Sequence, residues 1–288
     1  MITDNNSAIE QIRRDKHTLL EGYVTEYLFK DQFLKDRNDT FSKGWWSASL
    51  GKERYFFYVK EFQNIVDRRL ETILSSQYEV WKVSFGDDLY FSSLKKTLSL
   101  EEFIDSKKLR KKRTPLNATC QTKNENRQNN CIDFFLEKDI LLEVAKERYF
   151  ADDFLTEYFD SMVNIDFVTL NKNDELCVIE TKFKYESRAD TFGINSGQLQ
   201  LFRELDQLGL QIFNVVLYNT TKDKSLSIFG YLNRTDINKY WLYGKLTNLD
   251  KRTKSMGPEE TSVDGKKKQE CFSFDKKELN YRCELRVR

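Results

Sequence analysis

The sequence predicts an α/β protein, because strand and helix patterns alternate over its central part. Two β-branched, apolar segments, 163–170 and 176–182, are separated by a polar loop and are typical of a β-hairpin. Helical periodicity lies on either side of this hairpin, at 135–149 and 197–209, and an apolar segment at 215–218 predicts a last strand. Helices that alternate with strands pack onto the faces of a sheet.

The region before this core is expected to be largely helical. Residues 7–37 carry apolar side chains at helical spacing, and a second helical pattern runs from 52 to 75. Between 80 and 91, two apolar segments flank Gly86–Asp88, which predicts a second hairpin. We expect residues 1–105 to serve recognition or assembly.

The best domain boundary is the polar stretch 106–130. It holds the basic run 107–113 and one of the two prolines, and we interpret it as a linker or long loop. The predicted core then occupies 131–232, and 233–288 is an extension rich in basic and aromatic residues.

Composition excludes several classes of protein. The formal net charge is +1, so overall charge does not indicate nucleic-acid binding. No apolar run is long enough to span a bilayer, and the N-terminus lacks a signal-peptide pattern, so no membrane partner is expected. The 5 cysteines are widely spaced without a C-x-x-C, which predicts free thiols in a reducing, cytoplasmic compartment. The sequence contains 1 histidine, His17, which excludes most catalysis that depends on histidine. Carboxylate–metal chemistry is not excluded.

The central hairpin carries the most informative polar residues. When it is folded symmetrically about Asn173, Asp166 lies opposite Glu180, and Lys182 shares the face of Glu180. Cross-strand neighbours are about 5 Å apart at Cβ, and like charges at that distance are destabilising. A divalent cation would remove this repulsion. The alternative is an exposed hairpin with solvated charges, which does not explain their place within two apolar strands.

These residues resemble the motif of the PD-(D/E)XK nuclease superfamily, which has the restriction-endonuclease-like fold. Asp166 matches the aspartate of that motif, and Glu180-Thr181-Lys182 matches its tripeptide, although Asn164-Ile165 and no proline precede the aspartate. The resemblance implies an αβββαβ core over about residues 133–219, with a mixed central sheet flanked by helices.

The resemblance also implies helical partners for the site. Members of the superfamily often place a glutamate on the first core helix, where Glu137 falls in the apolar stripe of 135–149. Glu143 and Glu147 are alternatives, and a helix-start carboxylate without a catalytic role is another. On the second helix, Gln198 would orient the phosphate or the attacking water, or its amide would bond the edge of the sheet.

Nucleic-acid contacts outside the core are open. Lys184 extends the alternation beyond Lys182 and is a candidate phosphate contact, as are Lys111 and Arg113 in the basic run. The alternatives are a solvated strand end and a solvated loop, since charge runs are commonly solvated.

The function implied by the resemblance is that of a Mg²⁺-dependent endodeoxyribonuclease, with Mn²⁺ able to substitute. Asp166, Glu180 and Glu137 would bind the metal, Lys182 would position the attacking water, and the products would carry a 5′-phosphate and a 3′-hydroxyl. A restriction or host-defence role is expected. The alternatives are a recombination, repair or transposon-end nuclease, RNA as the substrate, and a non-catalytic nucleic-acid-binding module. Double-strand cleavage with one site per chain would favour a homodimer.

Overall fold

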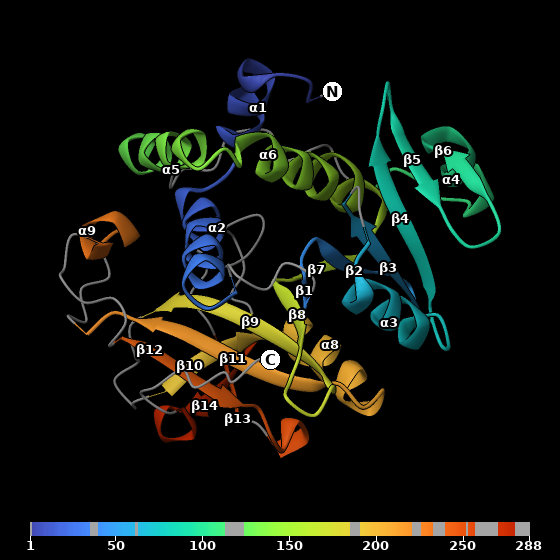
Figure 1. Cartoon of the computed structure of the whole chain (residues 1–288). Coiled ribbons are helices and arrows are strands. Elements are labelled where there is room, and N and C mark those ends of the chain that lie inside the picture. Colours follow the sequence, from blue (N-terminus) through green and yellow to red (C-terminus); the bar gives the residue numbers. More distant parts are fainter. Residues whose placement is uncertain are drawn as a thin grey trace. The chain divides into compact units, whose positions relative to one another are not determined.

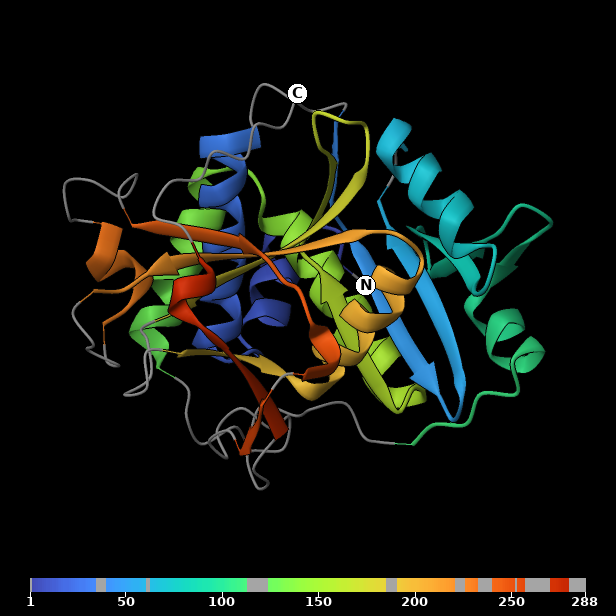
Figure 2. The ribbon, with the colours of Figure 1, turned by 90° about the horizontal axis from the view of Figure 1, so that it is seen from below.

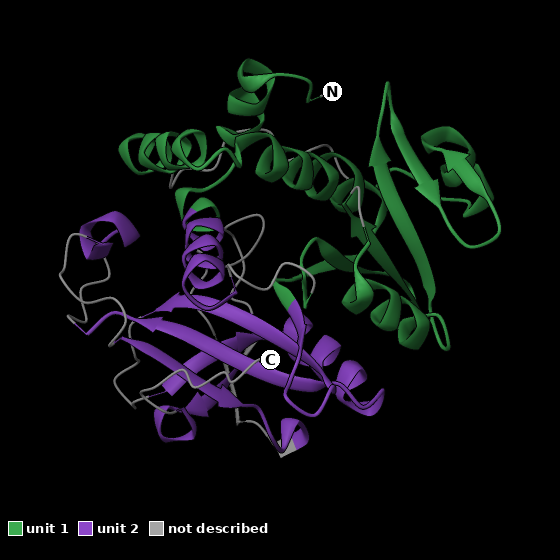
Figure 3. Cartoon of the chain, viewed as in Figure 1, with its two compact units in different colours: residues 1–20, 39–167 green, residues 21–38, 168–288 purple. Residues whose placement is uncertain are grey.

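The computed structural model consists of two compact units. It describes residues 2–34, 40–60, 63–112, 124–184, 191–220, 226–232, 240–251, 253–256 and 270–279. Unit 1 comprises residues 1–20 and 39–167, and unit 2 comprises residues 21–38 and 168–288 (Figure 3). The division falls between Phe167 and Val168, so the expected linker 106–130 lies within the sequence range of unit 1, and part of it, 113–123, lies outside the described residues.

Unit 1 contains a six-stranded mixed sheet in the order β6-β5-β4-β3-β2-β7 (Figure 1). Its strands and the short β1 are β1 (Phe41–Ser42), β2 (Trp45–Leu50), β3 (Glu53–Val59), β4 (Glu79–Phe85), β5 (Leu89–Ser92), β6 (Thr97–Ser99) and β7 (Ser161–Ile165). Strands β3 and β4 are parallel, and the other neighbours are antiparallel. The predicted hairpin between 80 and 91 is therefore confirmed as β4 and β5. The prediction of a largely helical N-terminal region is wrong, because a six-stranded sheet lies there.

Helices cover this sheet and enclose an aromatic core. The helical segments of unit 1 are α1 (Asn5–Ile12), α3 (Ile65–Leu74), α4 (Leu100–Ser106), α5 (Glu125–Glu137), α6 (Leu141–Tyr149), the π-helix Phe150–Leu155 and α7 (Thr156–Tyr158), and α2 (His17–Phe29) begins in this unit. Phe57 of the sheet packs against Phe103 of α4 and Phe150 of the π-helix, with ring centroids 6.1 and 5.4 Å apart. Such aromatic pairs bury large apolar areas and hold the helices on the sheet.

Two helices expected from periodicity, at 7–37 and 52–75, are interrupted or shorter in the structure. The stretch 7–37 forms α1 and α2 with a break between them, because the chain turns there to bury Asp15 against Arg148. In 52–75, the aromatic run Tyr55–Val59 is buried on both faces as part of β3, and only α3 is helical. Consecutive buried apolar residues match a helical template as well as a central strand, which explains the wrong prediction.

Unit 2 contains strands that lie side by side in the order β8-β9-β11-β12, where yellow β9 and orange β11 are parallel (Figures 1 and 2). A second sheet has the order β10-β14-β13. The strands are β8 (Phe167–Leu170), which begins at the last residue of unit 1, β9 (Leu176–Lys184), β10 (Thr191–Asn195), β11 (Gln211–Tyr218), β12 (Trp241–Lys245), β13 (Thr253–Met256) and β14 (Glu270–Asp275). The hairpin β8–β9, the helix near 197–209 and the strand at 215–218 are confirmed.

Each face of the β9–β11–β12 sheet has its own cover. The helical segments of unit 2 are the end of α2, the π-helix Lys30–Leu34, α8 (Ser196–Gln207), α9 (Ile228–Leu232) and the 3₁₀ turns Leu249–Lys251 and Lys276–Glu278. On one face, Trp241 lies 5.7 Å from Phe29 of α2 between ring centroids. Because strand residues alternate, Glu180, Asn214 and Gly244 lie on the other face, where α8 packs.

The α/β class is therefore confirmed, whereas the specific αβββαβ core stays a prediction, since β10 pairs in the second sheet. None of the helices that the structure describes has the length and the hydropathy needed to cross a membrane.

Candidate functional site

Strand β9 places a carboxylate inside an apolar sheet. Its first residues, Leu176–Ile179, are buried on both faces, as is typical of a central strand with neighbours on both sides. Glu180 follows them and is only 2% exposed. A buried carboxylate is costly unless charged or hydrogen-bonding groups compensate it, so the partners of Glu180 define the site.

Two predicted site residues contact the same oxygen of Glu180. Gln198, in the first turn of α8, donates a hydrogen bond of 2.5 Å from Nε2 to Oε1, and the Lys182 ammonium forms an ion pair with Oε1. Gln198 is buried, whereas the Lys182 side chain is 29% exposed. The structure therefore brings Glu180, Lys182 and Gln198 together within unit 2, with the amine on the side that solvent reaches.

Asn214 is a further polar residue that the sequence reasoning missed. It lies on β11 directly beside Glu180 in the parallel register and is 2% exposed. Its Oδ1 atom is buried and makes no hydrogen bond to any residue that the structure describes. One available sequence signal was that Asn214 is the one polar residue within the apolar run 212–217.

Basic groups follow Lys182 along the same face. Lys184 is beside Tyr218 in the register, and its ammonium donates a hydrogen bond of 2.7 Å to the carbonyl of Gly193. The ammonium of Lys276 lies 4.4 Å from the Tyr218 ring centroid and 3.1 Å from its hydroxyl oxygen. Positively charged side chains therefore extend from Lys182, beside the buried carboxylate, toward the end of β9.

Asp166 occupies the break between two strands. The expected continuous strand 163–170 is interrupted there, because β7 ends at Ile165 and β8 begins at Phe167. Asp166 is 4% exposed, and Asn164 donates a hydrogen bond of 3.0 Å from Nδ2 to its Oδ1. Asp166 belongs to unit 1 and Glu180 to unit 2, so their expected position opposite each other stays a prediction.

The placement of Glu137 in a buried helical stripe is wrong. The expected helix 135–149 is broken, since α5 ends at Glu137 and α6 begins at Leu141, with Asp139 at a φ of 55° between them. A residue with positive φ ends a right-handed helix. The Glu137 side chain is 71% exposed and forms an ion pair of 2.8 Å with Lys138.

The two alternatives to Glu137 lie on α6. Glu143 is exposed, and Lys43 lies 3.3 Å from it, whereas Glu147 is buried and 4.0 Å from the same amine. Of the three glutamates in the expected helix 135–149, Glu147 is thus the buried one.

Three lysines in the described part of the basic run 107–113 are paired with carboxylates. Lys111 forms an ion pair of 2.8 Å with Glu157. The hydrogen bond within this pair raises the pKa of Lys111 above its usual value. Lys107 and Lys112 form ion pairs with Glu79 and Asp160. Arg113 lies outside the described residues. These ion pairs occupy three of the amines of the run, and its phosphate contacts stay a prediction.

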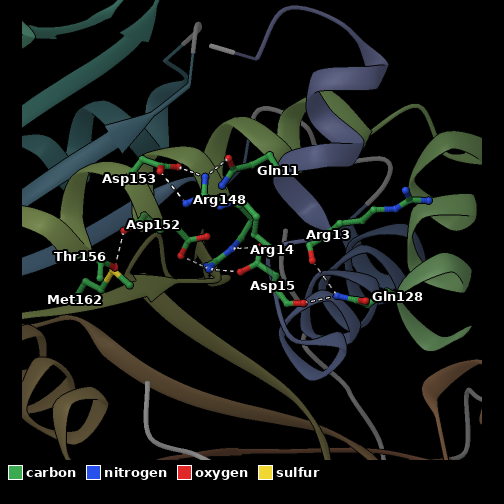
Figure 4. Close-up of polar contacts among 11 residues, drawn as sticks. Gln11, Arg13, Arg14, Asp15, Gln128, Arg148, Asp152, Asp153, Thr156 and Met162 are labelled. Atoms are coloured by element: carbon green, nitrogen blue, oxygen red, sulfur yellow. Dashed lines mark hydrogen bonds and ion pairs between the residues drawn. The ribbon is translucent and has the colours of Figure 1, made fainter. Parts of the chain in front are cut away.

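A second cluster of charged residues lies in unit 1. Arg148 donates hydrogen bonds of 2.8 and 2.7 Å to the two carboxylate oxygens of Asp15 and one of 2.6 Å to Asp152 (Figure 4). Gln128 donates to the backbone carbonyl of Asp15. Burial raises the pKa of Asp152 to about 7, against the opposing effect of Arg148. The bidentate contact between Arg148 and Asp15 has the geometry of a structural ion pair, and it joins α6 to the α1–α2 connection.

Two side chains with oxygen donors lie next to each other on the face of β9 and β11. The part of the chain that the structure describes holds no group of three or more His, Cys, Asp or Glu residues that could bind a metal ion. The face of β9 and β11 instead offers one carboxylate and the buried amide oxygen of Asn214, and carboxylate and amide oxygens are ligands that suit Mg²⁺ and Mn²⁺.

Comparison with known proteins adds no family to this picture. No protein-family model, curated protein or solved structure matches the chain at a significant level.

Proposed function

We propose that the protein is a Mg²⁺-dependent endodeoxyribonuclease that hydrolyses phosphodiester bonds in DNA. The observation that carries this proposal is the contact of buried Glu180 with both Lys182 and Gln198. Glu180 and Lys182 match the tripeptide of the PD-(D/E)XK motif, and several branches of that superfamily carry a glutamine on the following helix. Here Lys182 and Gln198 contact the same oxygen of Glu180. Asp166, which directly precedes β8, is proposed as the second carboxylate of the site.

The chemistry assigned to the site is hydrolysis by an in-line water. Attack at phosphorus forms a bond to the water oxygen and breaks the bond to O3′, leaving a 5′-phosphate and a 3′-hydroxyl. Lys182 would donate a hydrogen bond to the attacking water and balance the charge that builds on the phosphoryl oxygens. Gln198 would hold the Glu180 carboxylate in place through Oε1. A bound Mg²⁺ would supply polarisation of the phosphate and a lower pKa of the attacking water.

The proposed substrate is anionic, and the residues beyond Lys182 suit it. Lys184 is the register partner of Tyr218 at the end of β9, and the Lys276 ammonium lies 4.4 Å from the Tyr218 ring centroid. Both lysines would contact phosphates that flank the scissile bond. Such contacts to phosphate fix the position of a nucleic acid without reading its sequence. Recognition of a target sequence, as in a restriction or host-defence enzyme, is assigned to other parts of the chain.

One assay panel tests the proposal. The purified protein is incubated with supercoiled plasmid and with single-stranded RNA, each with Mg²⁺, Mn²⁺ or EDTA, and Glu180→Gln serves as the matched inactive variant. We expect metal-dependent cleavage of the plasmid by the wild type alone. Discrete fragments support a restriction-type enzyme, and structure-dependent products support a recombination, repair or transposon-end nuclease. Cleavage of RNA alone, or no cleavage by the folded protein, refutes the DNase assignment.

We further propose that the chain acts as a homodimer when it cuts both strands, because one site cleaves one phosphodiester bond at a time. Light scattering of the protein bound to a DNA duplex in Ca²⁺, which does not support cleavage, should then give the mass of two chains plus one duplex. A one-chain complex that still makes double-strand breaks in a single encounter contradicts this.

A further inference from the structure

Asn214 places a buried amide directly beside Glu180 on the neighbouring strand. We infer that the side-chain oxygen of Asn214 is a ligand of the divalent cation that Glu180 binds, so that β9 and β11 each contribute one oxygen. This inference rests on the metal dependence of the proposed function.

The first observation is that Asn214 is a poor residue for its position unless it binds something. It is 2% exposed in the centre of the sheet, and its Oδ1 accepts no hydrogen bond from the residues that the structure describes. Buried amide oxygens are nearly always hydrogen-bonded, because leaving one without a partner costs free energy. Asparagine is also disfavoured in strands, and its neighbours Phe213 and Val215 show what the sheet otherwise selects.

The second observation is the register between the two strands. Asn214 pairs with Glu180, so the two side chains leave the sheet on the same face from adjacent strands. Adjacent strands are about 4.8 Å apart. Oxygens that bind one Mg²⁺ each lie about 2.1 Å from it, so side chains from neighbouring strands reach a common ion without rearrangement of the backbone.

On the side of β12, the backbone leaves no room for another side chain next to Asn214. On β12, the register partner of Asn214 is Gly244, where an added Cβ would lie 2.3 Å from the carbonyl oxygen of Glu278. The backbone of Glu278 thus takes the place of a side chain from β12. On the opposite side, Glu180 is bonded to Gln198 and Lys182. The Asn214 amide therefore lies between a closed backbone contact and the proposed catalytic carboxylate.

The test measures Mn²⁺ binding, which does not depend on cleavage. Wild type, Asn214→Leu and Asn214→Asp are titrated with MnCl₂ by calorimetry and by the electron paramagnetic resonance of free Mn²⁺. Asn173→Leu is the matched control, because Asn173 is exposed in the β8–β9 turn of the same unit. Circular dichroism checks that each variant is folded.

We expect Asn214→Leu to weaken Mn²⁺ binding by about tenfold or more, as loss of a group that supports a metal site does. Asn214→Asp, which keeps an oxygen and adds charge, should bind at least as tightly as wild type, and Asn173→Leu should be unchanged. Wild-type affinity in folded Asn214→Leu overturns the inference, as does a wild-type protein that binds no Mn²⁺.

A second measurement decides the question if Asn214→Leu does not fold. Adding Mn²⁺ should raise the melting temperature of Asn214→Asp more than that of wild type, because the cation removes repulsion between residue 214 and Glu180. Equal shifts overturn the inference. The outcomes are separable from the nuclease proposal, because a chain that binds Mn²⁺ through Asn214 but cleaves no DNA refutes only the nuclease.

Discussion

The amide of Gln198 donates a hydrogen bond of 2.5 Å to the Glu180 oxygen that also pairs with Lys182. This contact ties the first turn of α8 to the middle of β9, two elements that are not adjacent in the chain. One carboxylate oxygen therefore receives a neutral and a charged donor, and the orientation of Glu180 depends on both.

Replacing Gln198 should affect stability and cleavage together. Gln198→Leu removes a hydrogen bond to a buried charge, which should lower the free energy of unfolding by about 1–3 kcal/mol. It should also reduce the cleavage rate, because Glu180 loses its fixed orientation. Urea unfolding and single-turnover cleavage measure the two effects. The control is Gln200→Leu on the exposed side of α8, which should change stability by less than about 0.5 kcal/mol. If Gln198→Leu and Gln200→Leu had the same stability and the same cleavage rate, the 2.5 Å contact between Gln198 and Glu180 would contribute to neither.

The ion pair of Glu180 and Lys182 should show strong energetic coupling. Lys182→Met leaves Glu180 buried beside an apolar side chain and should destabilise the fold by about 2 kcal/mol or more. In Glu180→Gln/Lys182→Met no charge is left, so we expect the double variant to recover part of that loss. A double-mutant cycle from urea unfolding should give a coupling of about 1–3 kcal/mol. Additive effects would contradict the ion pair between Lys182 and the buried Glu180.

The Asp152 carboxyl should make stability depend on pH. Its pKa is raised from 3.8 to about 7, mainly by burial, so the folded state favours the protonated form more than the unfolded state does. The stabilisation is complete below about pH 4 and is lost as the pH rises through about 7. Asp152→Asn stays neutral, so its stability relative to wild type should increase between about pH 5 and pH 8. Unfolding curves at four pH values that run parallel for both proteins would refute this assignment.

Glu137 should be dispensable. Its side chain is 71% exposed and pairs only with the neighbouring Lys138 among the contacts resolved for it. Glu137→Ala should therefore keep the wild-type cleavage rate and change stability by less than about 0.5 kcal/mol. A loss of Mg²⁺-dependent cleavage in this variant would restore Glu137 to the site.

Local patterns in the sequence predict the elements around the site well. The β8–β9 hairpin follows from two apolar runs around a polar turn, and the turn closes with a hydrogen bond of 2.9 Å between the backbone of Asn171 and Glu175. The sequence also places Gln198 correctly next to the sheet. The reason is that Gln198 lies on the apolar face of a short amphipathic helix, and that face packs inward. In these cases, periodicity and turn residues agree with tertiary packing.

Longer-range contacts explain what the sequence leaves out. The break after Glu137 depends on a positive φ at Asp139, which periodicity does not report. Strand β3 is buried on both faces and lacks the alternation that distinguishes a strand from a helix. Asn214 becomes notable only when the parallel register places it beside Glu180. That register is a property of the folded sheet, not of either strand.

Single-turnover cleavage of supercoiled plasmid in Mg²⁺ by wild type, Asp166→Ala and Lys182→Ala tests the assignment of the site most directly. Each variant is compared at equal concentrations of folded protein, and Lys172→Ala in the β8–β9 turn is the control. We predict nicking by wild type and by the control, and a loss of at least about 100-fold in the two site variants. Metal-dependent nicking that persists in Asp166→Ala or Lys182→Ala would contradict the site.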